Sequence, residues 1–261
     1  MSLSVVVITK NEEGTIQRCL QSAAWADEIV VVDSGSTDRT VDICRELGAR
    51  VMITSDWPGF GKQKNRALAQ AKGDWVLSLD ADEWVSERLR EEIRAAMAAP
   101  GSVVAFRIPR LSSYCGRFMR HSGWWPDHVM RLFKRGCARF SEDIVHERTI
   151  VEGPLGTLQE PLLHESLVDL EDVIDTMDRY SSDSARMMHE RGERSSLGKA
   201  LLHAAWSFLR TYLLRAGFLD GREWLMLAIS NAEGTYYRYT KLMLLHHRDG
   251  IPGAAAHRRR R

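Results

Sequence analysis

Short apolar runs alternate with helical patterns through the first 80 residues of the chain. The apolar runs are residues 3–9, 28–33, 50–53 and 75–79, and the segments with helical periodicity are 15–25, 37–47 and 62–72. Short apolar runs flanked by turn-forming residues are typical of buried strands. Strands that alternate with helices at this spacing predict right-handed βαβ units and a parallel sheet.

Polar side chains follow three of these runs, where each strand is expected to end. They are Thr9, Asn11, Glu12, Asp33, Asp80 and Asp82. Open α/β folds bind ligands at the carboxyl ends of their strands, and Mg²⁺ takes oxygen ligands while bridging to phosphates. Asp80 and Asp82 therefore predict a metal–diphosphate site. The alternatives are turn chemistry for Asp-x-Asp, a helix N-cap for Asp33 and an early-helix carboxylate for Glu12.

Three motifs in this half resemble those of a known family. Residues 9–13 (TKNEE), 32–38 (VDSGSTD) and 79–83 (LDADE) are similar, in order and spacing, to the amino-terminal half of family-2 glycosyltransferases. Residues 57–67 (WPGFGKQKNRA), with the later RLF and VHE motifs at 131–133 and 145–147, resemble the subgroup that includes lipopolysaccharide-core β-1,4-glucosyltransferases. The resemblance covers most of residues 1–165 and implies a GT-A fold, an α/β nucleotide-binding domain.

The resemblance also implies roles for single residues. Asp33 would contact uracil, Thr9 and Glu12 the base and ribose side, and Asn11 would belong to the same nucleotide-sugar site. Asp80 would contact the ribose or donor sugar, and Asp82 would bind Mg²⁺ or Mn²⁺. Lys64 and Asn65, in the predicted helix 62–72, would lie beside the donor. The alternative for each lysine of that helix is that it belongs to a basic face exposed to solvent.

Inverting transfer also needs a carboxylate that takes the proton of the acceptor hydroxyl. The candidates are Asp143, Glu147 and Glu142, with Asp143 ranked first and Glu147 second. His146 is a candidate for a further metal ligand, for an acceptor-orienting residue or for a structural histidine. For His164 the same alternatives apply, and the structural one is favoured.

Composition is typical of a compact enzyme. The chain is 44% hydrophobic and 27% charged, and its formal net charge of +1 gives no case for nucleic-acid binding. Its four cysteines are widely spaced, which favours reduced thiols in a cytoplasmic protein. No secretory signal or membrane-spanning stretch is expected from the sequence.

The pattern changes to helices after about residue 166. We therefore expect an α/β catalytic domain over 1–165, with a mostly parallel sheet flanked by helices, and a helical extension over 166–261. Residues 197–215 are apolar and edged with cations, and 257–261 (HRRRR) form a basic end. These features favour peripheral contact with an anionic membrane, and packing on protein or a solvated tail is the alternative.

These observations together predict an inverting, metal-dependent transferase. It would move a hexose, with glucose favoured, from a UDP-sugar to a lipid-linked saccharide such as inner-core lipopolysaccharide, at the cytoplasmic face of the inner membrane. The alternatives are a polyprenyl-phosphate sugar transferase, a sugar nucleotidyltransferase and a non-catalytic nucleotide-sugar-binding scaffold. The sequence leaves the donor sugar, the acceptor hydroxyl, the metal and the oligomeric state open.

Overall fold

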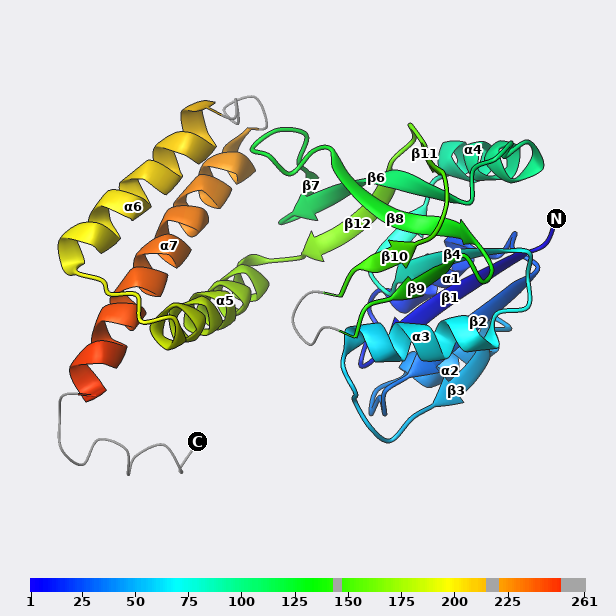
Figure 1. Cartoon of the computed structure of the whole chain (residues 1–261), viewed down its shortest axis with the longest axis horizontal. Helices are drawn as coiled ribbons and strands as arrows, with labels where there is room; N and C mark the ends of the chain where they lie inside the picture. The colour runs from blue at the N-terminus through cyan, green and yellow to red at the C-terminus, as the bar shows by residue number, and fades with distance from the viewer. Residues whose placement is uncertain (143–146, 215–220, 250–261) are drawn as a thin grey trace. The chain divides into compact units, whose positions relative to one another are not determined.

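The computed structural model describes residues 1–142, 147–214 and 221–249 (Figure 1). It divides into two compact units. The first consists of Met1–Ser112 and Pro126–Glu165, and the second consists of Ser113–Trp125 and the chain from Ser166 onward. The second unit thus includes an inserted segment, 113–125, that the change of pattern at residue 166 does not reveal.

The first unit is built on a mixed β-sheet. Four parallel strands lie in the order β3-β2-β1-β4, and β4 continues into antiparallel β8 and β6. The bounds are β1 Leu3–Thr9, β2 Glu28–Asp33, β3 Arg50–Ile53, β4 Trp75–Asp80, β6 Ala105–Tyr114 and β8 Asp127–Lys134. The predicted α/β class is confirmed. The sheet is parallel from β3 to β4, and beyond β4 it is mixed, because β8 pairs antiparallel with β4 and β6 whereas β11 (Leu155–Thr157) pairs parallel with β6.

Shorter strands complete this unit. In the large sheet they are β5 Glu83–Val85, β11 Leu155–Thr157 and β12 Leu162–Leu167, and a separate pair is formed by β9 Ala138–Phe140 and β10 Thr149–Val151. β12 runs antiparallel to β5, so that His164 lies opposite Glu83. This pairing attaches a strand from residue 162 onward to the short strand that follows Asp82.

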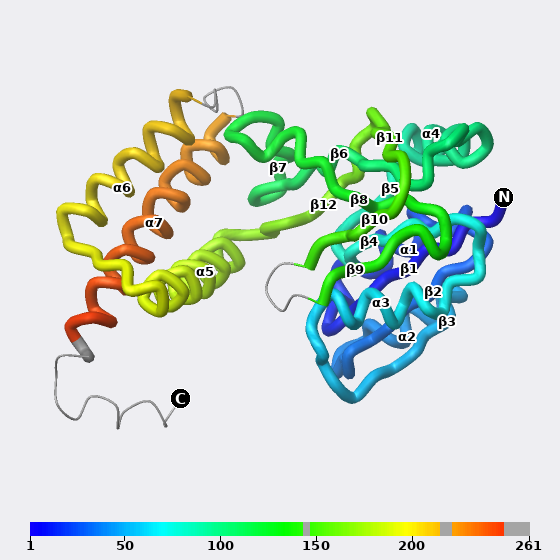
Figure 2. Tube along the Cα trace, in the orientation of Figure 1, coloured from blue at the N-terminus to red at the C-terminus, as the bar shows by residue number. Residues whose placement is uncertain are grey.

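Helices and the small β9–β10 pair cover the two faces of the parallel strands. The helices are α1 Ile16–Ser22, α2 Thr40–Glu46, α3 Phe60–Gln70 and α4 Glu87–Ala98, which Figure 2 follows along the chain. Val5 and Val7 pack in one hydrophobic cluster with residues of α1 and α4, whereas Val6 and Ile8 pack in another with Ala67 of α3 and Phe140. Alternate residues thus face opposite layers, as expected for strands buried on both sides.

The second unit is mainly helical. Its helices are α5 Leu170–Glu190, α6 Leu197–Leu209 with its π-helical continuation η1 Arg210–Leu214, and α7 Arg222–Asp249. Both α5 and α6 pack against α7, and the end of β6 pairs with β7 Arg117–Phe118. Tyr114, Val173 and Trp224 lie at the centre of its hydrophobic core. Within the described ranges, no helix is both long and apolar enough to cross a membrane.

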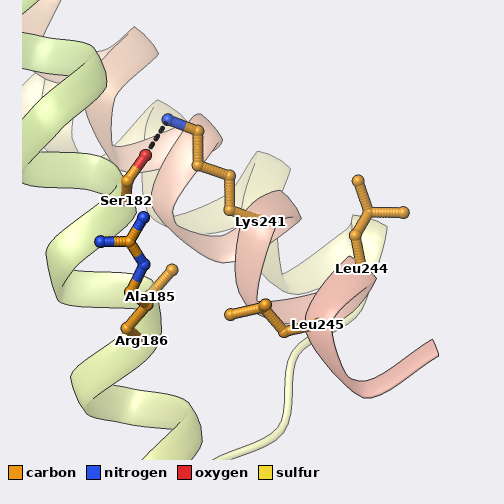
Figure 3. A pocket seen from close by; sticks show the side chains of 6 residues that line it. All are labelled: Ser182, Ala185, Arg186, Lys241, Leu244 and Leu245. Atoms are coloured by element: carbon orange, nitrogen blue, oxygen red, sulfur yellow. Dashed lines mark hydrogen bonds between the residues drawn. The ribbon is translucent and has the colours of Figure 1, made fainter. Parts of the chain in front are cut away.

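A pocket of about 190 Å³ lies between α5 and α7 (Figure 3). Lys241 is one of its lining residues, and its ammonium group donates to the Asp178 carboxylate at 2.6 Å and to the Ser181 and Ser182 hydroxyls at 2.8 Å. Arg186, which also lines the pocket, is paired with Asp183 at 3.0 Å. Lys241 therefore ties α7 to α5, whereas the Arg186–Asp183 pair lies within α5.

Candidate active site

The carboxylate of Asp33 is held rigidly at the end of β2. It is fully buried and accepts hydrogen bonds from the Thr9 hydroxyl at 3.0 Å and from the backbone N–H groups of Gly35 at 2.9 Å and Ser36 at 2.8 Å. The Ser36 hydroxyl donates to it as well. Gly35 has φ +80°, a conformation that favours glycine. The turn around Asp33 is thus fixed, and its contact with a nucleobase stays a prediction.

Asn11 and Glu12 lie at the neighbouring end of β1. The Asn11 side-chain oxygen accepts from the Thr37 backbone N–H at 2.8 Å, which ties the loop after β1 to the loop after β2. Burial raises the pKa of the Glu12 carboxyl, and the nearby charge of Asp82 raises it further, although Thr15 donates to Glu12 at 3.0 Å. The Glu12 carboxyl therefore lies close enough to Asp82 for the two charges to interact.

Asp80, the last residue of β4, lies between two buried cations. Its Oδ1 is 2.9 Å from the Lys64 ammonium group, and its Oδ2 accepts from the Arg131 guanidinium. Burial opposes ionisation of this carboxyl, but the charges of Arg131 and Lys64 outweigh it and hold the pKa of Asp80 well below its usual range. Asp80 is therefore ionised and neutralised by protein cations on both of its oxygens.

Glu83 is the second anion of this buried cluster. Its carboxylate is fully buried and accepts from Arg131 at 2.6 Å, and from the Asp80 backbone N–H at 3.0 Å. Burial raises the pKa of Glu83, and the charge of Asp80 adds to that effect. Ser86 caps α4 by accepting from the Leu89 N–H at 3.2 Å. Glu83 thus holds Arg131 against Asp80.

Asp82 faces the imidazole of His164. His164 Nε2 lies 3.2 Å from Asp82 Oδ2, and its Nδ1 lies 2.8 Å from the Ser112 hydroxyl. An imidazole oriented through its second nitrogen beside a carboxylate is the usual arrangement around a protein-bound metal. In the described part of the chain, no three His, Cys, Asp or Glu side chains gather as a metal site. Asp82 and His164 fit Mg²⁺ or Mn²⁺ if substrate oxygens supply further ligands.

The three candidates for the catalytic base differ in their surroundings. Glu142 is exposed and lies 3.5 Å from Lys62, whereas Glu147 lies 3.0 Å from the buried Lys64. Lys64 thus bridges Glu147 and Asp80. Asp143 lies outside the described residues, as does His146, the sequence candidate for a metal ligand.

Helix α3 holds the start of the segment that contains these candidates. Both polar atoms of the Asn65 side chain bond the backbone of Phe140, each at 2.9 Å. A Cβ atom at Gly61 would lie 1.8 Å from the Ser141 carbonyl oxygen, so only glycine permits this close approach. Asn65 therefore positions the backbone here, and a direct contact with the donor stays a prediction for it.

Comparison with known proteins assigns this fold and motif set to a family. The model of "Glycosyl transferase family 2" matches residues 4–149, more than half of the chain. The chain belongs to glycosyltransferase family 2. It is 30% identical to an uncharacterized glycosyltransferase of Rickettsia typhi over 92% of this chain and 86% of that protein. It is also 30% identical to the lipopolysaccharide core biosynthesis glycosyltransferase LpsC of Rhizobium meliloti, over 92% and 93% of the two chains.

A solved structure has the same fold. The TarS 1–349 structure from Staphylococcus aureus in complex with UDP-GlcNAc matches with a TM-score of 0.50 at 17% identity, over 96% of this chain and 92% of that chain. At this identity the likeness concerns the GT-A fold alone. This family-2 glycosyltransferase therefore has the fold that the motifs at residues 9–13, 32–38 and 79–83 predict.

The partners of Asp80 and Asp82 lie far from them in the sequence. Arg131 lies in β8 before Leu132 and Phe133, and a buried arginine among apolar residues was the available signal that it pairs with an acid. His164 lies in β12, and no local pattern marks it as the neighbour of Asp82. Both contacts depend on strand pairing between segments distant in the chain.

Proposed function

We propose that this family-2 glycosyltransferase moves a hexose, with glucose favoured, from a UDP-sugar to a lipid-linked saccharide such as the inner core of lipopolysaccharide. The observation that carries the proposal is the connected site at the ends of β1, β2 and β4, where Lys64 lies between Asp80 and Glu147 and Asp82 faces His164. The similarity to LpsC, named for lipopolysaccharide core biosynthesis, supports the class of acceptor.

The donor would bind along the edge formed by these strand ends. Asp33 would accept from uracil, with Thr9, Asn11 and Glu12 around the nucleoside. Asp33 is suited to this role because its bonds to the turn after β2 hold the carboxylate in place. Lys64 is buried and lies 2.9 Å from Asp80, which holds its ammonium group beside the position proposed for the diphosphate.

Asp82 and His164 would hold a divalent cation, Mg²⁺ or Mn²⁺, together with oxygens of the diphosphate. When bound, the cation supplies Lewis-acid stabilisation of the negative charge that develops on the departing UDP. Ser112 orients His164 through its Nδ1, which leaves Nε2 directed toward Asp82. The carboxylate of Asp80, already paired with Arg131 and Lys64, would position these groups and contact the donor.

The acceptor hydroxyl would attack the anomeric carbon from the face opposite UDP, and the configuration would invert. A carboxylate must take the hydroxyl proton as the new bond forms. Glu147 is the described candidate that contacts the site, through its ion pair with Lys64 at 3.0 Å. Asp143 is the alternative base. The reaction would take place at the cytoplasmic face of the inner membrane, where the acceptor lipid is anchored.

A binding experiment tests the donor class first. Calorimetry with UDP-glucose, UDP-galactose, UDP-N-acetylglucosamine, GDP-mannose and dTDP-glucose is run with Mn²⁺ and with EDTA. We expect metal-dependent binding of the UDP compounds only, with the metal-dependent part lost in Asp82→Ala and kept in the control Asp175→Ala, an exposed position on α5. Absence of binding by folded protein would contradict the proposal.

Transfer itself is measured as UDP release with each bound donor and an inner-core acceptor lacking its outer sugars. We expect release that depends on the acceptor and a product one hexose larger by mass spectrometry. Release without an acceptor-bound sugar would indicate hydrolysis and would exclude the proposed acceptor.

A further inference from the structure

One side of α6 carries large apolar side chains that are exposed. Leu202 is 70% exposed and Trp206 54%, and further positions along the same helix and η1 are also exposed. We call this set the α6 face; it consists of Leu202, Trp206, Leu209 and Leu213, which recur at intervals of three to four residues and so share one side. The surfaces of soluble proteins seldom have so many large apolar residues on one helix, so the α6 face is expected to contact an apolar partner.

The opposite side of α6 is occupied by α7. Ala200 is buried there, the His203 ring stacks on Tyr239 with centroids 4.4 Å apart, and the Ser207 hydroxyl donates to the Asn231 carbonyl oxygen at 3.2 Å. Figure 1 shows α6 and α7 running beside each other in this way. Phe208 of α6 also packs against the buried cluster that contains Trp224 and Leu227 of α7. The helix pair is thus joined by these contacts, while the residues of the α6 face stay exposed.

The charges of this segment have one sign. Residues 197–214 include Lys199 and Arg210 and no aspartate or glutamate, whereas α5 carries six acidic residues. Lys199 and Arg210 are eleven residues apart, about three helical turns, so both lie on the same side of the helix, between Trp206 and α7. The Lys199 ammonium group lies 5.4 Å from the centroid of the Tyr239 ring of α7. The α6 face is therefore apolar with cations along one edge.

We propose that the α6 face docks in the interface of a membrane that contains anionic lipids. An amphipathic helix with tryptophan and leucine on one side and cations at the edge lies in the plane of the headgroups, with its apolar side in the acyl boundary. Arg210 would meet a lipid phosphate, and Lys199, which donates to the Arg194 carbonyl oxygen at 3.2 Å, would add positive charge at the same edge. Residues 197–214 contain no aspartate or glutamate. Their positive charge therefore attracts the anionic headgroups of a membrane more strongly than a protein surface with few acidic residues.

Vesicle flotation tests this docking. We use vesicles of phosphatidylcholine alone and vesicles mixed with phosphatidylglycerol, and compare the whole chain with the variants Leu202→Gln/Trp206→Gln and Arg210→Gln. We expect binding to the anionic vesicles, roughly tenfold or more weaker in the double variant and about fivefold weaker in Arg210→Gln. The matched control is Ile174→Gln on α5, 49% exposed in the native chain, which should bind as the native chain does.

A second readout reports insertion. Quenching of tryptophan fluorescence by brominated lipid should be smaller in Trp206→Phe than in the native chain, because Trp206 is expected to reach the acyl boundary. Far-UV circular dichroism verifies that each variant is folded.

Equal vesicle binding by the native chain and the double variant would overturn the docking, as would absence of binding to anionic vesicles. If the native chain sediments as a dimer and the double variant as a monomer, a second copy of the chain covers the α6 face. That result would also overturn membrane docking. No donor or acceptor is present in these measurements, so their failure would leave the proposed sugar transfer standing.

Discussion

The imidazole Nε2 of His164 lies 3.2 Å from the carboxylate of Asp82, although 82 residues separate them in the chain. Antiparallel pairing of β12 with β5 creates this contact, because β5 begins at Glu83, the residue after Asp82. Glu83 in turn pairs with Arg131, which also contacts Asp80. The short segment 80–83 is therefore held by side chains from β12 and β8, His164 and Arg131.

His164→Ala is expected to weaken the binding of UDP-sugar in Mn²⁺ and to leave binding in EDTA unchanged, because it removes a proposed metal ligand. Ser112→Ala should lower the affinity for UDP-sugar in Mn²⁺ by a smaller factor, about tenfold, because the Ser112 hydroxyl only orients the imidazole. Calorimetry measures both effects. The control is His128→Ala, an exposed position on β8. Equal affinities of native chain and His164→Ala in Mn²⁺ would exclude His164 as a ligand.

Glu147→Gln is expected to lower kcat by about 10² to 10⁴ with little change in KM for the donor, because an amide cannot take the acceptor proton. Steady-state kinetics of UDP release measures this. Glu142→Gln is the matched control, since Glu142 is exposed and pairs with Lys62. A loss confined to Asp143→Asn would assign the base to Asp143 and leave Glu147 as a partner of Lys64.

Asp80→Asn is expected to lower the free energy of unfolding at pH 7 by about 1–3 kcal/mol. This loss is smaller than for a fully buried ion pair, because the Asp80 side chain is 30% exposed. The folded-state pKa of Asp80 is lowered by Arg131 and Lys64, despite burial. Its stabilisation is therefore complete above the unfolded value of about 4 and is lost as pH falls toward the folded value.

Urea unfolding at several pH values measures this difference between the native chain and Asp80→Asn. The difference should be constant from neutral pH to about pH 5 and shrink below about pH 4. Asp175→Asn, on an exposed surface of α5, should show no such dependence. A difference that grew as the pH fell would contradict the lowered pKa.

Gly61→Ala is expected to reduce stability by about 1–3 kcal/mol and to lower transfer, because the added Cβ would meet the Ser141 carbonyl oxygen at 1.8 Å. To avoid this clash the backbone at Ser141 would have to move, and with it the start of the segment that leads to Glu147. Gly14→Ala is the control, since nothing lies within 4 Å of the Cβ position there. Urea unfolding and UDP release measure both variants, and native behaviour of Gly61→Ala would show that this contact is not required.

The sequence by itself determined the parallel half of the sheet and its family. The predicted runs at 3–9, 28–33 and 50–53 coincide with β1, β2 and β3, and the fourth predicted run, 75–79, ends one residue before β4 does. Strand and helix periods are local properties of the chain, and consecutive parallel strands deliver their carboxyl ends to one edge. The placement of Asp33 and Asp80 at that edge follows from these two facts.

Only the tertiary structure decided which residues complete the site. Arg131 and His164 reach Asp80 and Asp82 through antiparallel strands from distant segments, and residues 113–125 join the second unit rather than the first. The free energy of such pairings depends on register and on burial across the whole sheet. No local pattern of apolar and polar residues encodes it, because the partners of a strand are chosen by global packing.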